Sequence, residues 1–200
     1  MKRLFDIVTA GVALVLLSPL FLLIAVIIKI DSPGPVFFRQ ERIGKDFHPF
    51  QIYKFRTMRR DAEKAGALVT AGEDARVTRA GRHLRRTKLD ELPQFINIVK
   101  GEMSLVGPRP EVSRYVELFR PDYEEILRVR PGLTDLASLK YRDEAGLLGS
   151  AADPEREYLA QVLPDKLKMA KDYLRQSSFV FDLRLIGRTL VKIIDYRTSH

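Results

Sequence analysis

The feature that most constrains this chain is a stretch of 22 residues without a charged side chain, from Ile7 to Ile28. A straight α-helix over it would be about 33 Å long, enough to cross the apolar core of a bilayer. Charges flank it on both sides, with Lys2 and Arg3 before it and Lys29 after it. A cleaved signal peptide is a poor match, because the run is too long and no small-residue cleavage site follows. The run therefore predicts a membrane anchor.

A proline inside this run predicts a kink. Pro19 has no backbone N–H, and its ring would clash with the carbonyl of Val15. The hydroxyl of Ser18 can bond to the carbonyl of Leu14 and satisfy part of the disturbed turn. Basic residues flank the run on both sides, so the charge pattern does not decide the orientation of this segment in the membrane. The residues alone favour neither a helix that breaks here and returns to its own side nor a spanning helix that tolerates its proline.

The charge of the chain predicts an anionic partner. The 200 residues have a formal net charge of +8. Two stretches, 39–60 and 76–100, each hold seven basic and two acidic residues, so the rest of the chain is slightly acidic. Nucleic acid, a phosphorylated substrate and an anionic membrane surface all fit. The length suits one domain, and the absence of cysteine excludes thiol nucleophiles, thiolate metal sites and disulfides.

The hydrophobic patterns predict a mainly helical α+β fold. Two β-prone runs, 36–38 and 50–55, predict a hairpin. Helices are expected over residues 59–66, 79–86, 112–129, 155–176 and 179–195, with a loop over 131–153. The last helix is amphipathic, which suits either an anionic membrane surface or packing on the core. Its apolar side holds Phe179, Leu183, Ile186, Leu190 and Ile194, and its basic side Arg184, Arg188 and Lys192.

Asp90 and Glu91 form the only adjacent acidic pair within a basic segment. Nearby arginines would lower the pKa of both carboxyl groups and keep them ionised as metal ligands or nucleophiles. Pro93 can occupy the first turn of a helix, which would put the pair near a positive helix end. An Asp-Glu pair is also a common N-terminal capping cluster, and taken alone the pair fits that role better.

Two proline-glycine turns stand out later in the chain. The turn Gly107–Pro110 would hold Arg109 in a fixed direction, which suits bidentate phosphate binding but also describes a turn with an incidental arginine. Arg130–Thr134 is a second turn of similar design. Three scattered histidines make a histidine-based metal site improbable; they are His48, His83 and His200. No P-loop, nucleophile elbow or dinucleotide fingerprint occurs.

In seven short strings, the chain resembles the bacterial sugar transferase family, the monotopic phosphoglycosyl transferases. The strings are Lys2–Asp6, Ser18–Pro19, Pro33–Gln40, Tyr53–Met58, Leu89–Gln94, Gly101–Pro110 and Arg130–Thr134. They cover nearly the whole chain in order. The resemblance implies a re-entrant helix–break–helix over residues 1–31. It implies that residues 32–200 form a catalytic domain that folds with this segment as one unit, on the cytoplasmic face of the bacterial inner membrane.

The resemblance also implies a reaction. A sugar-1-phosphate passes from a UDP-sugar to a polyprenol phosphate such as undecaprenyl phosphate, and UMP is released, as the first membrane step of glycoconjugate or polysaccharide assembly. In the family the aspartate of the Asp-Glu pair forms a phosphosugar intermediate, and turnover depends on Mg²⁺. Carried over, Asp90 is the nucleophile and Glu91 its partner in metal binding or proton handling.

Four basic residues are carried over as ligands of phosphate or nucleotide: Lys54, Arg85, Arg109 and Arg142. The implied partners are the two substrates and membrane lipids, with a homodimer and downstream glycosyltransferases as further candidates. No nucleic acid is expected, because the basic segments lack interleaved aromatic residues or a reading helix.

The chain departs from the family after Thr134. Many members read Gly-Leu-Ala-Gln-Val-Asn-Gly-Arg where this chain reads Asp-Leu-Ala-Ser-Leu-Lys-Tyr-Arg over 135–142, so the sugar is not assigned. Two other functions stay open on the residues themselves. One is a membrane-anchored basic protein that binds anionic lipid or nucleic acid without catalysis. The other is a Mg²⁺-dependent phosphohydrolase that uses the same carboxylates.

Overall fold

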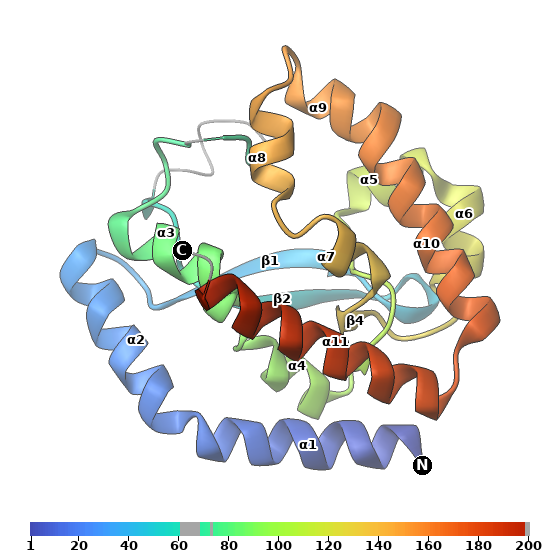
Figure 1. Cartoon of the computed structure of the whole chain (residues 1–200), viewed down its shortest axis with the longest axis horizontal. Coiled ribbons are helices and arrows are strands. Elements are labelled where there is room, and N and C mark those ends of the chain that lie inside the picture. The colour runs from blue at the N-terminus through green and yellow to red at the C-terminus, as the bar shows by residue number, and fades with distance from the viewer. Residues whose placement is uncertain (61–68, 73, 199–200) are drawn as a thin grey trace.

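A computed structural model of the chain describes residues 1–60, 69–72 and 74–198, with side-chain surroundings up to residue 192. Helices surround two short two-stranded sheets (Figure 1), which confirms the predicted mainly helical α+β class. The helix predicted over 59–66 lies mostly outside the described residues, as does His200.

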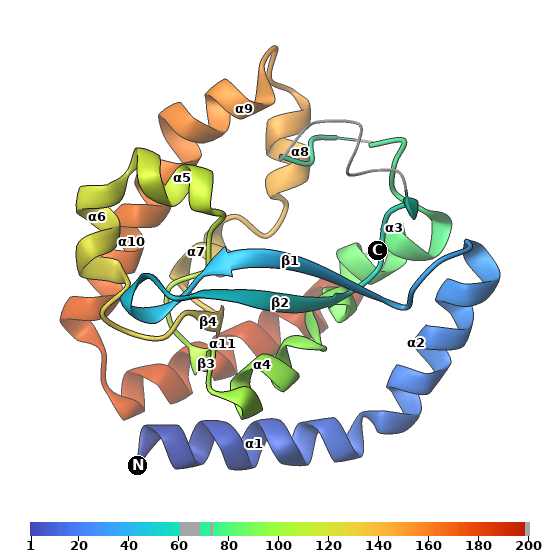
Figure 2. The same cartoon turned by 180° about the vertical axis from the view of Figure 1, so that it is seen from behind.

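The apolar run forms two helices instead of one. α1 (Lys2–Leu16) and α2 (Ser18–Asp31) meet at Leu17 with a bend of 60° and border two sides of the molecule in Figures 1 and 2. Among the described residues, no single helix is both long and apolar enough to cross a bilayer, and only this bent pair, counted together, meets that requirement. The kink predicted at Ser18–Pro19 is confirmed.

The position of the break follows from the missing N–H of Pro19. In an unbroken helix the amide of residue 19 would donate to the carbonyl of Val15, and a proline cannot do so. The hydroxyl of Ser18 donates to this carbonyl instead, over 2.8 Å. The predicted bond from Ser18 to Leu14 is therefore wrong, because the carbonyl left without a donor is the one of Val15.

The predicted hairpin is confirmed, and its first strand is longer than expected. β1 (Phe37–Ile43) pairs antiparallel with β2 (Pro49–Phe55), in a register that sets Phe37 opposite Phe55. Figure 2 shows the hairpin crossing the middle of the molecule, with helices on both sides. Lys54 is the penultimate residue of β2, so the hairpin carries this side chain into the interior of the fold.

The second sheet joins the two proline-glycine turns. β3 (Ser104–Val106) pairs in parallel with β4 (Gly132–Thr134). A Cβ atom on Gly132 would lie 2.1 Å from the backbone nitrogen of Gly107, so the close approach of the two chains requires glycine there. This contact fixes the start of the turn that carries Arg109.

The acidic pair lies in the connection between two predicted helices. α3 (Arg79–Thr87) ends at Lys88, whose φ of 59° reverses the chain direction. A 3₁₀ turn (Leu89–Glu91) contains both acidic residues, and α4 (Gln94–Lys100) begins directly after Pro93. The expected place of the pair near the start of a helix is confirmed, although Pro93 is the N-cap residue of α4 and does not lie within its first turn.

The second half of the chain departs from prediction at 112–129. The single helix expected there is two helices, α5 (Ser113–Leu118) and α6 (Arg120–Ile126). Pro121 cannot donate a backbone hydrogen bond into the preceding turn, so the first helix ends before it and a new one begins around it.

The loop predicted over 131–153 is also wrong. This stretch contains β4 and two short helices, α7 (Leu136–Lys140) and α8 (Glu144–Gly149). Each helix has an aspartate cap: Asp135 accepts from the amide of Ser138 over 2.7 Å, and Asp143 caps α8 in the same way. The two aspartates were a helix signal in the sequence, since Asp is among the preferred N-cap residues.

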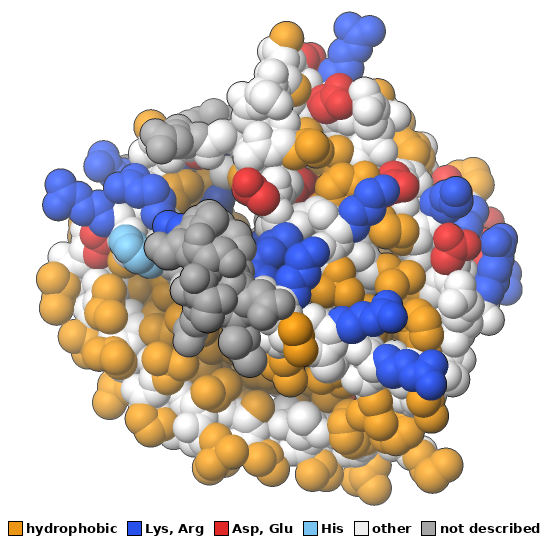
Figure 3. Space-filling view, in the orientation of Figure 1, with side chains coloured by type: hydrophobic (Ala, Val, Ile, Leu, Met, Phe, Trp, Pro, Cys, Tyr) orange, Lys and Arg blue, Asp and Glu red, His pale blue; other side chains and the backbone are white. Residues whose placement is uncertain are grey.

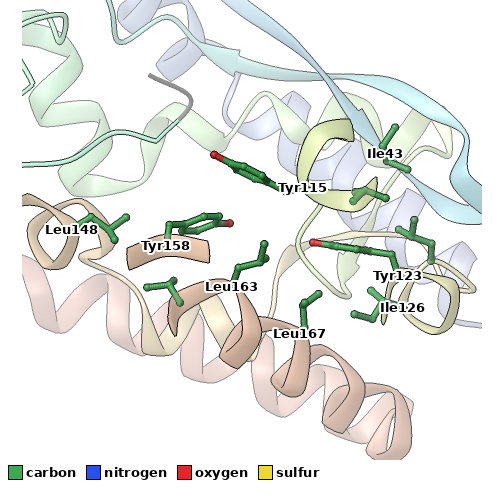
Figure 4. Packing of buried hydrophobic residues seen from close by; sticks show 11 residues of the cluster. Ile43, Tyr115, Tyr123, Ile126, Leu148, Tyr158, Leu163 and Leu167 are labelled. Carbon is green, nitrogen blue, oxygen red and sulfur yellow. The ribbon is translucent and has the colours of Figure 1, made fainter. Parts of the chain in front are cut away.

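Three consecutive segments form the helix predicted over 155–176. They are α9 (Pro154–Glu157), a π-helical turn (Tyr158–Val162) and α10 (Leu163–Gln176). They pack against α5, α6 and α8 around one apolar cluster, whose labelled members in Figure 4 are Ile43, Tyr115, Tyr123, Ile126, Leu148, Tyr158, Leu163 and Leu167. This cluster supports α7 and α8, which together form one wall of a cavity.

The final helix, α11 (Phe179–Thr198), packs only in part through the apolar side predicted for it, because Ile186 of that side lies against the core. Leu185 and Asp182 are buried, whereas Phe179, Leu183 and Leu190 are 44, 42 and 56% exposed. The side chain of residue 194 lies outside the described ones. The helix therefore has a second apolar face that the rest of the fold leaves largely uncovered.

Asp6 links α1 to the second sheet. Its buried carboxylate accepts hydrogen bonds from the hydroxyl of Ser104 over 2.7 Å and from the amide of Leu105 over 3.3 Å. Asp6→Ala would leave both donors buried without a partner, which we expect to lower the free energy of unfolding by about 2 kcal/mol. Thermal unfolding in detergent measures this effect, with the exposed Glu41→Ala as the control. An unchanged melting temperature would mean that the other contacts of α1, which include those of Lys2 and Arg3, hold this helix without Asp6.

Candidate active site

The six residues predicted to act in catalysis or phosphate binding line one open cavity of about 1670 Å³. They are Asp90, Glu91, Lys54, Arg85, Arg109 and Arg142. They come from the 3₁₀ turn before α4, from β2, from α3, from the turn after β3 and from the turn after α7. The fold therefore brings together residues that stand up to 88 positions apart in the sequence.

Asp90 has the properties of a reactive carboxylate. Its side chain is buried, and its Oδ1 atom has no hydrogen-bond partner among the described residues. Burial, helped by the charge of Glu91, raises the pKa of Asp90 to about 6, so the lowered pKa predicted for this carboxyl group is wrong. A buried carboxylate oxygen without a partner is costly, so its presence at a cavity wall indicates a group kept available for a ligand.

Glu91 is held by two cations. One of its carboxylate oxygens lies 3.1 Å from Nζ of Lys54, and Arg109 contacts both oxygens, one of them over 3.2 Å. Burial alone would raise the pKa of Glu91, but the charges of Arg109 and Lys54 bring it well below its ordinary value. The two predicted phosphate ligands therefore bind the neighbouring carboxylate in this structure.

The remaining predicted ligands lie on two different walls. Arg85 donates through Nε to the hydroxyl of Thr57 over 2.8 Å, which fixes its guanidinium beside the carboxylate pair. Arg142 lies on the wall formed by α7 and α8, where it donates to the backbone carbonyl of Lys192. The second arrangement ties the end of α7 to α11.

Two residues that position the site were not predicted, although both stand in the string Tyr53–Met58. Thr57 orients Arg85, as described above. Arg56 is buried and donates to the carbonyls of Pro33 and Ser32 over 2.8 and 2.6 Å, so it attaches the end of α2 to the end of β2. Both residues directly follow the β-prone run 50–55, and this position was the available sequence signal for them. The run predicts a strand, but it does not indicate what either side chain contacts.

The carboxylate pair fits the Mg²⁺ expected from the resemblance. The described residues contain no group of three or more Asp, Glu, His or Cys side chains that could hold a metal ion. Mg²⁺ does not require such a group, because it is commonly held by one or two carboxylates together with phosphate oxygens and water. Asp90 offers an unpartnered oxygen, whereas Glu91 would first have to give up a cationic partner.

Comparison with known proteins shows which family the chain resembles. A family model described as bacterial sugar transferase matches residues 1–196. The chain is 40% identical over 198 residues to the UDP-N-acetylgalactosamine-undecaprenyl-phosphate N-acetylgalactosaminephosphotransferase of Aeromonas hydrophila, covering 96% of this chain and 43% of that protein. It is 40% identical to the exopolysaccharide production protein PSS of Rhizobium leguminosarum bv. phaseoli, covering 96 and 94%.

A third relative is the UDP-glucose:undecaprenyl-phosphate glucose-1-phosphate transferase of Escherichia coli (strain K12). It is 37% identical over 196 residues, which cover 96% of this chain and 40% of that protein. The chain thus spans less than half the length of two of these relatives and nearly the whole length of the other.

Proposed function

The chain belongs to the bacterial sugar transferase family, and we propose that it transfers a sugar-1-phosphate from a UDP-sugar to a polyprenol phosphate such as undecaprenyl phosphate. One observation carries the proposal: a buried carboxylate with an unpartnered oxygen, Asp90, lies beside several cations at the wall of an open cavity. The sugar is left unassigned, because the relatives are named for different sugars.

The proposed chemistry uses Asp90 twice. Its carboxylate oxygen attacks the phosphorus next to the sugar, the bond from that phosphorus to the bridging oxygen breaks, and UMP leaves. A phosphate oxygen of the lipid then attacks the same phosphorus, and Asp90 departs as a carboxylate. Neither step needs a proton from the protein. A carboxylate nucleophile of this kind divides one difficult transfer into two easier ones.

The cations around Glu91 explain how two anionic substrates can react. Lys54 and Arg109 are already oriented by the carboxylate, and phosphate oxygens can take over these contacts when a substrate binds. Arg85 lies beside them, held by Thr57. Fixed positive groups stabilise the charge that develops on phosphate oxygens without a further cost of reorganisation. A Mg²⁺ ion held by Asp90 would supply additional charge neutralisation.

We also propose that α1 and α2 form a re-entrant membrane segment with the catalytic part on the cytoplasmic face. The apolar side chains exposed on these helices support this; they include Leu4, Val8, Val12, Val15, Leu16, Leu22, Leu23, Val26, Ile27 and Ile30. Figure 3 shows apolar side chains covering the lower edge of the molecule, where α1 runs, and Lys and Arg gathering above it.

Cysteine labelling tests this topology, since the chain has no native cysteine. One variant carries a cysteine inserted between Met1 and Lys2, and the other is Arg60→Cys. We expect an impermeant maleimide to label both from the cytoplasmic side of inverted membranes. Labelling from opposite sides would exclude the re-entrant arrangement.

UMP release tests the proposed reaction. The purified chain is incubated with Mg²⁺, undecaprenyl phosphate and a panel of UDP-sugars. We expect sustained UMP release with at least one donor, only when the lipid is present, and loss of release when EDTA removes the metal. Equal release without the lipid would indicate hydrolysis instead. No release with any donor would favour a protein that binds anionic lipid without catalysis.

A further inference from the structure

One flank of the catalytic cavity is apolar. Asp90, Lys54 and Arg109 line its polar part, and Phe95 of α4 stands on the adjoining wall. The other apolar side chains of this flank come from β4, α7 and α11; they are Leu133, Leu139, Ile186 and Leu190. A nucleotide sugar has no long apolar tail that would match this flank.

The apolar flank rests on the part of the core that includes the membrane helix. Phe95, Leu133, Leu139 and Ile186 are partly buried and pack on one apolar cluster, which also contains Ala10 of α1. β3 contacts both α1 and α11, so the two helices lie on the same region of the core. Figures 1 and 2 agree that α11 runs over α4 on the side that α1 borders.

The flank also reaches the outer surface. Leu190 lines the cavity, and its side chain is nevertheless 56% exposed. The neighbouring Val191 and Leu183 are 57 and 42% exposed on the outer face of α11. Apolar side chains of the cavity wall therefore extend from α4 to the exposed part of the last helix.

We propose that this path, between α4 and α11, binds the isoprenoid chain of the lipid acceptor, with its phosphate directed to Asp90. We call it the acceptor groove and define it by Phe95, Leu133, Leu139, Ile186 and Leu190. The assignment rests on the proposed function. Its basis is complementarity: a molecule with an anionic head and a long apolar tail matches a cavity whose cationic end continues into an apolar groove.

A second apolar region of the cavity is a poorer match. Phe37 lines the cavity near the start of the hairpin, but its ring stacks on Phe55 with 5.5 Å between centroids, and it packs on the cluster that contains Ile24 and Ile28. Phe55 thus covers one face of the Phe37 ring, which leaves less apolar surface for a ligand on this alternative route to Asp90.

Photo-crosslinking distinguishes the two routes without requiring turnover. The probe is a polyprenyl phosphate with a diazirine in its second isoprene unit, added to the full chain in lipid nanodiscs. We expect undecaprenyl phosphate to compete with labelling of peptides that contain Phe95 or residues 186–190. Competed labelling confined to Phe37 and Phe38, or no competed labelling at all, would overturn the groove. Because no donor is present, this result does not depend on the proposed reaction.

A pair of neighbouring variants provides the kinetic test. Leu190→Gln changes the groove, whereas Val191→Gln changes an equally exposed residue of the same helix that does not line the cavity. We expect Leu190→Gln to raise the KM for undecaprenyl phosphate about tenfold relative to Val191→Gln, as the loss of one apolar contact implies. The KM for the UDP-sugar should be the same in both variants. Equal lipid KM values in the two variants would contradict the groove, whereas absence of transfer by the unmodified chain would refute the proposed function instead.

Discussion

Asp90→Asn is expected to lower the rate of sugar-phosphate transfer by at least about 10³-fold, because the amide cannot form the bond to phosphorus. The same variant should be as stable as the native chain or more stable at pH 7. Burial raises the pKa of Asp90 to about 6, so the ionised group is unfavourable for folding, and a neutral side chain removes that cost. The measurements are UMP release and the melting temperature in detergent.

The two measurements together distinguish a loss of chemistry from a loss of folding. A loss of activity together with a lower melting temperature would leave a damaged fold as the explanation. A fully stable variant with near-native turnover would mean that the nucleophile is another group. Loss of turnover at unchanged or higher stability is the result expected if the buried charge of Asp90 is retained for chemistry.

Arg109→Lys has the second largest expected effect. The guanidinium contacts both oxygens of Glu91, and a lysine ammonium cannot reproduce this two-point geometry. We expect kcat/KM for the UDP-sugar to fall about 10²-fold, the usual cost of removing one fixed positive or hydrogen-bonding group from such a site. Steady-state kinetics with varied UDP-sugar at saturating lipid phosphate measures this change.

Arg130→Lys is the matched control for this substitution. Arg130 begins the companion turn, donates through Nε to the carbonyl of Gly101 over 2.8 Å, and does not line the cavity. It should keep most of the activity. If both lysine variants lose activity equally, the effect comes from the packing of the two turns, and Arg109 has no special role in the transfer.

The candidate site was predictable because its residues stand in short, specific strings. The pair Asp90 and Glu91, the turn around Arg109 and the β-prone run ending near Lys54 were each recognisable locally. Their convergence on one cavity was implied only by the resemblance. The ion pairs of Glu91 could not be foreseen, because they join residues 18 and 37 positions away and depend on how the second sheet sets its turns.

The fold was predictable where local signals agreed and not where they competed. The hairpin and the break at Pro19 followed from strong backbone preferences. The short helices α7 and α8 were missed, because their apolar patterns are brief and only the capping aspartates Asp135 and Asp143 mark them. The orientation of α11 was open, because it has two apolar faces and only tertiary packing selects the buried one.

Covalent capture tests the central claim, that Asp90 itself receives the phosphosugar. The chain is mixed with a UDP-sugar and Mg²⁺ in the absence of lipid, quenched within milliseconds to seconds, and analysed by intact-protein and peptide mass spectrometry. We predict about one equivalent of UMP and a sugar-phosphate adduct on the peptide that contains Asp90. Undecaprenyl phosphate added afterwards should remove the adduct, and Asp90→Asn should give neither the adduct nor UMP. UMP release that requires both substrates together, with no adduct at any time, would contradict the mechanism.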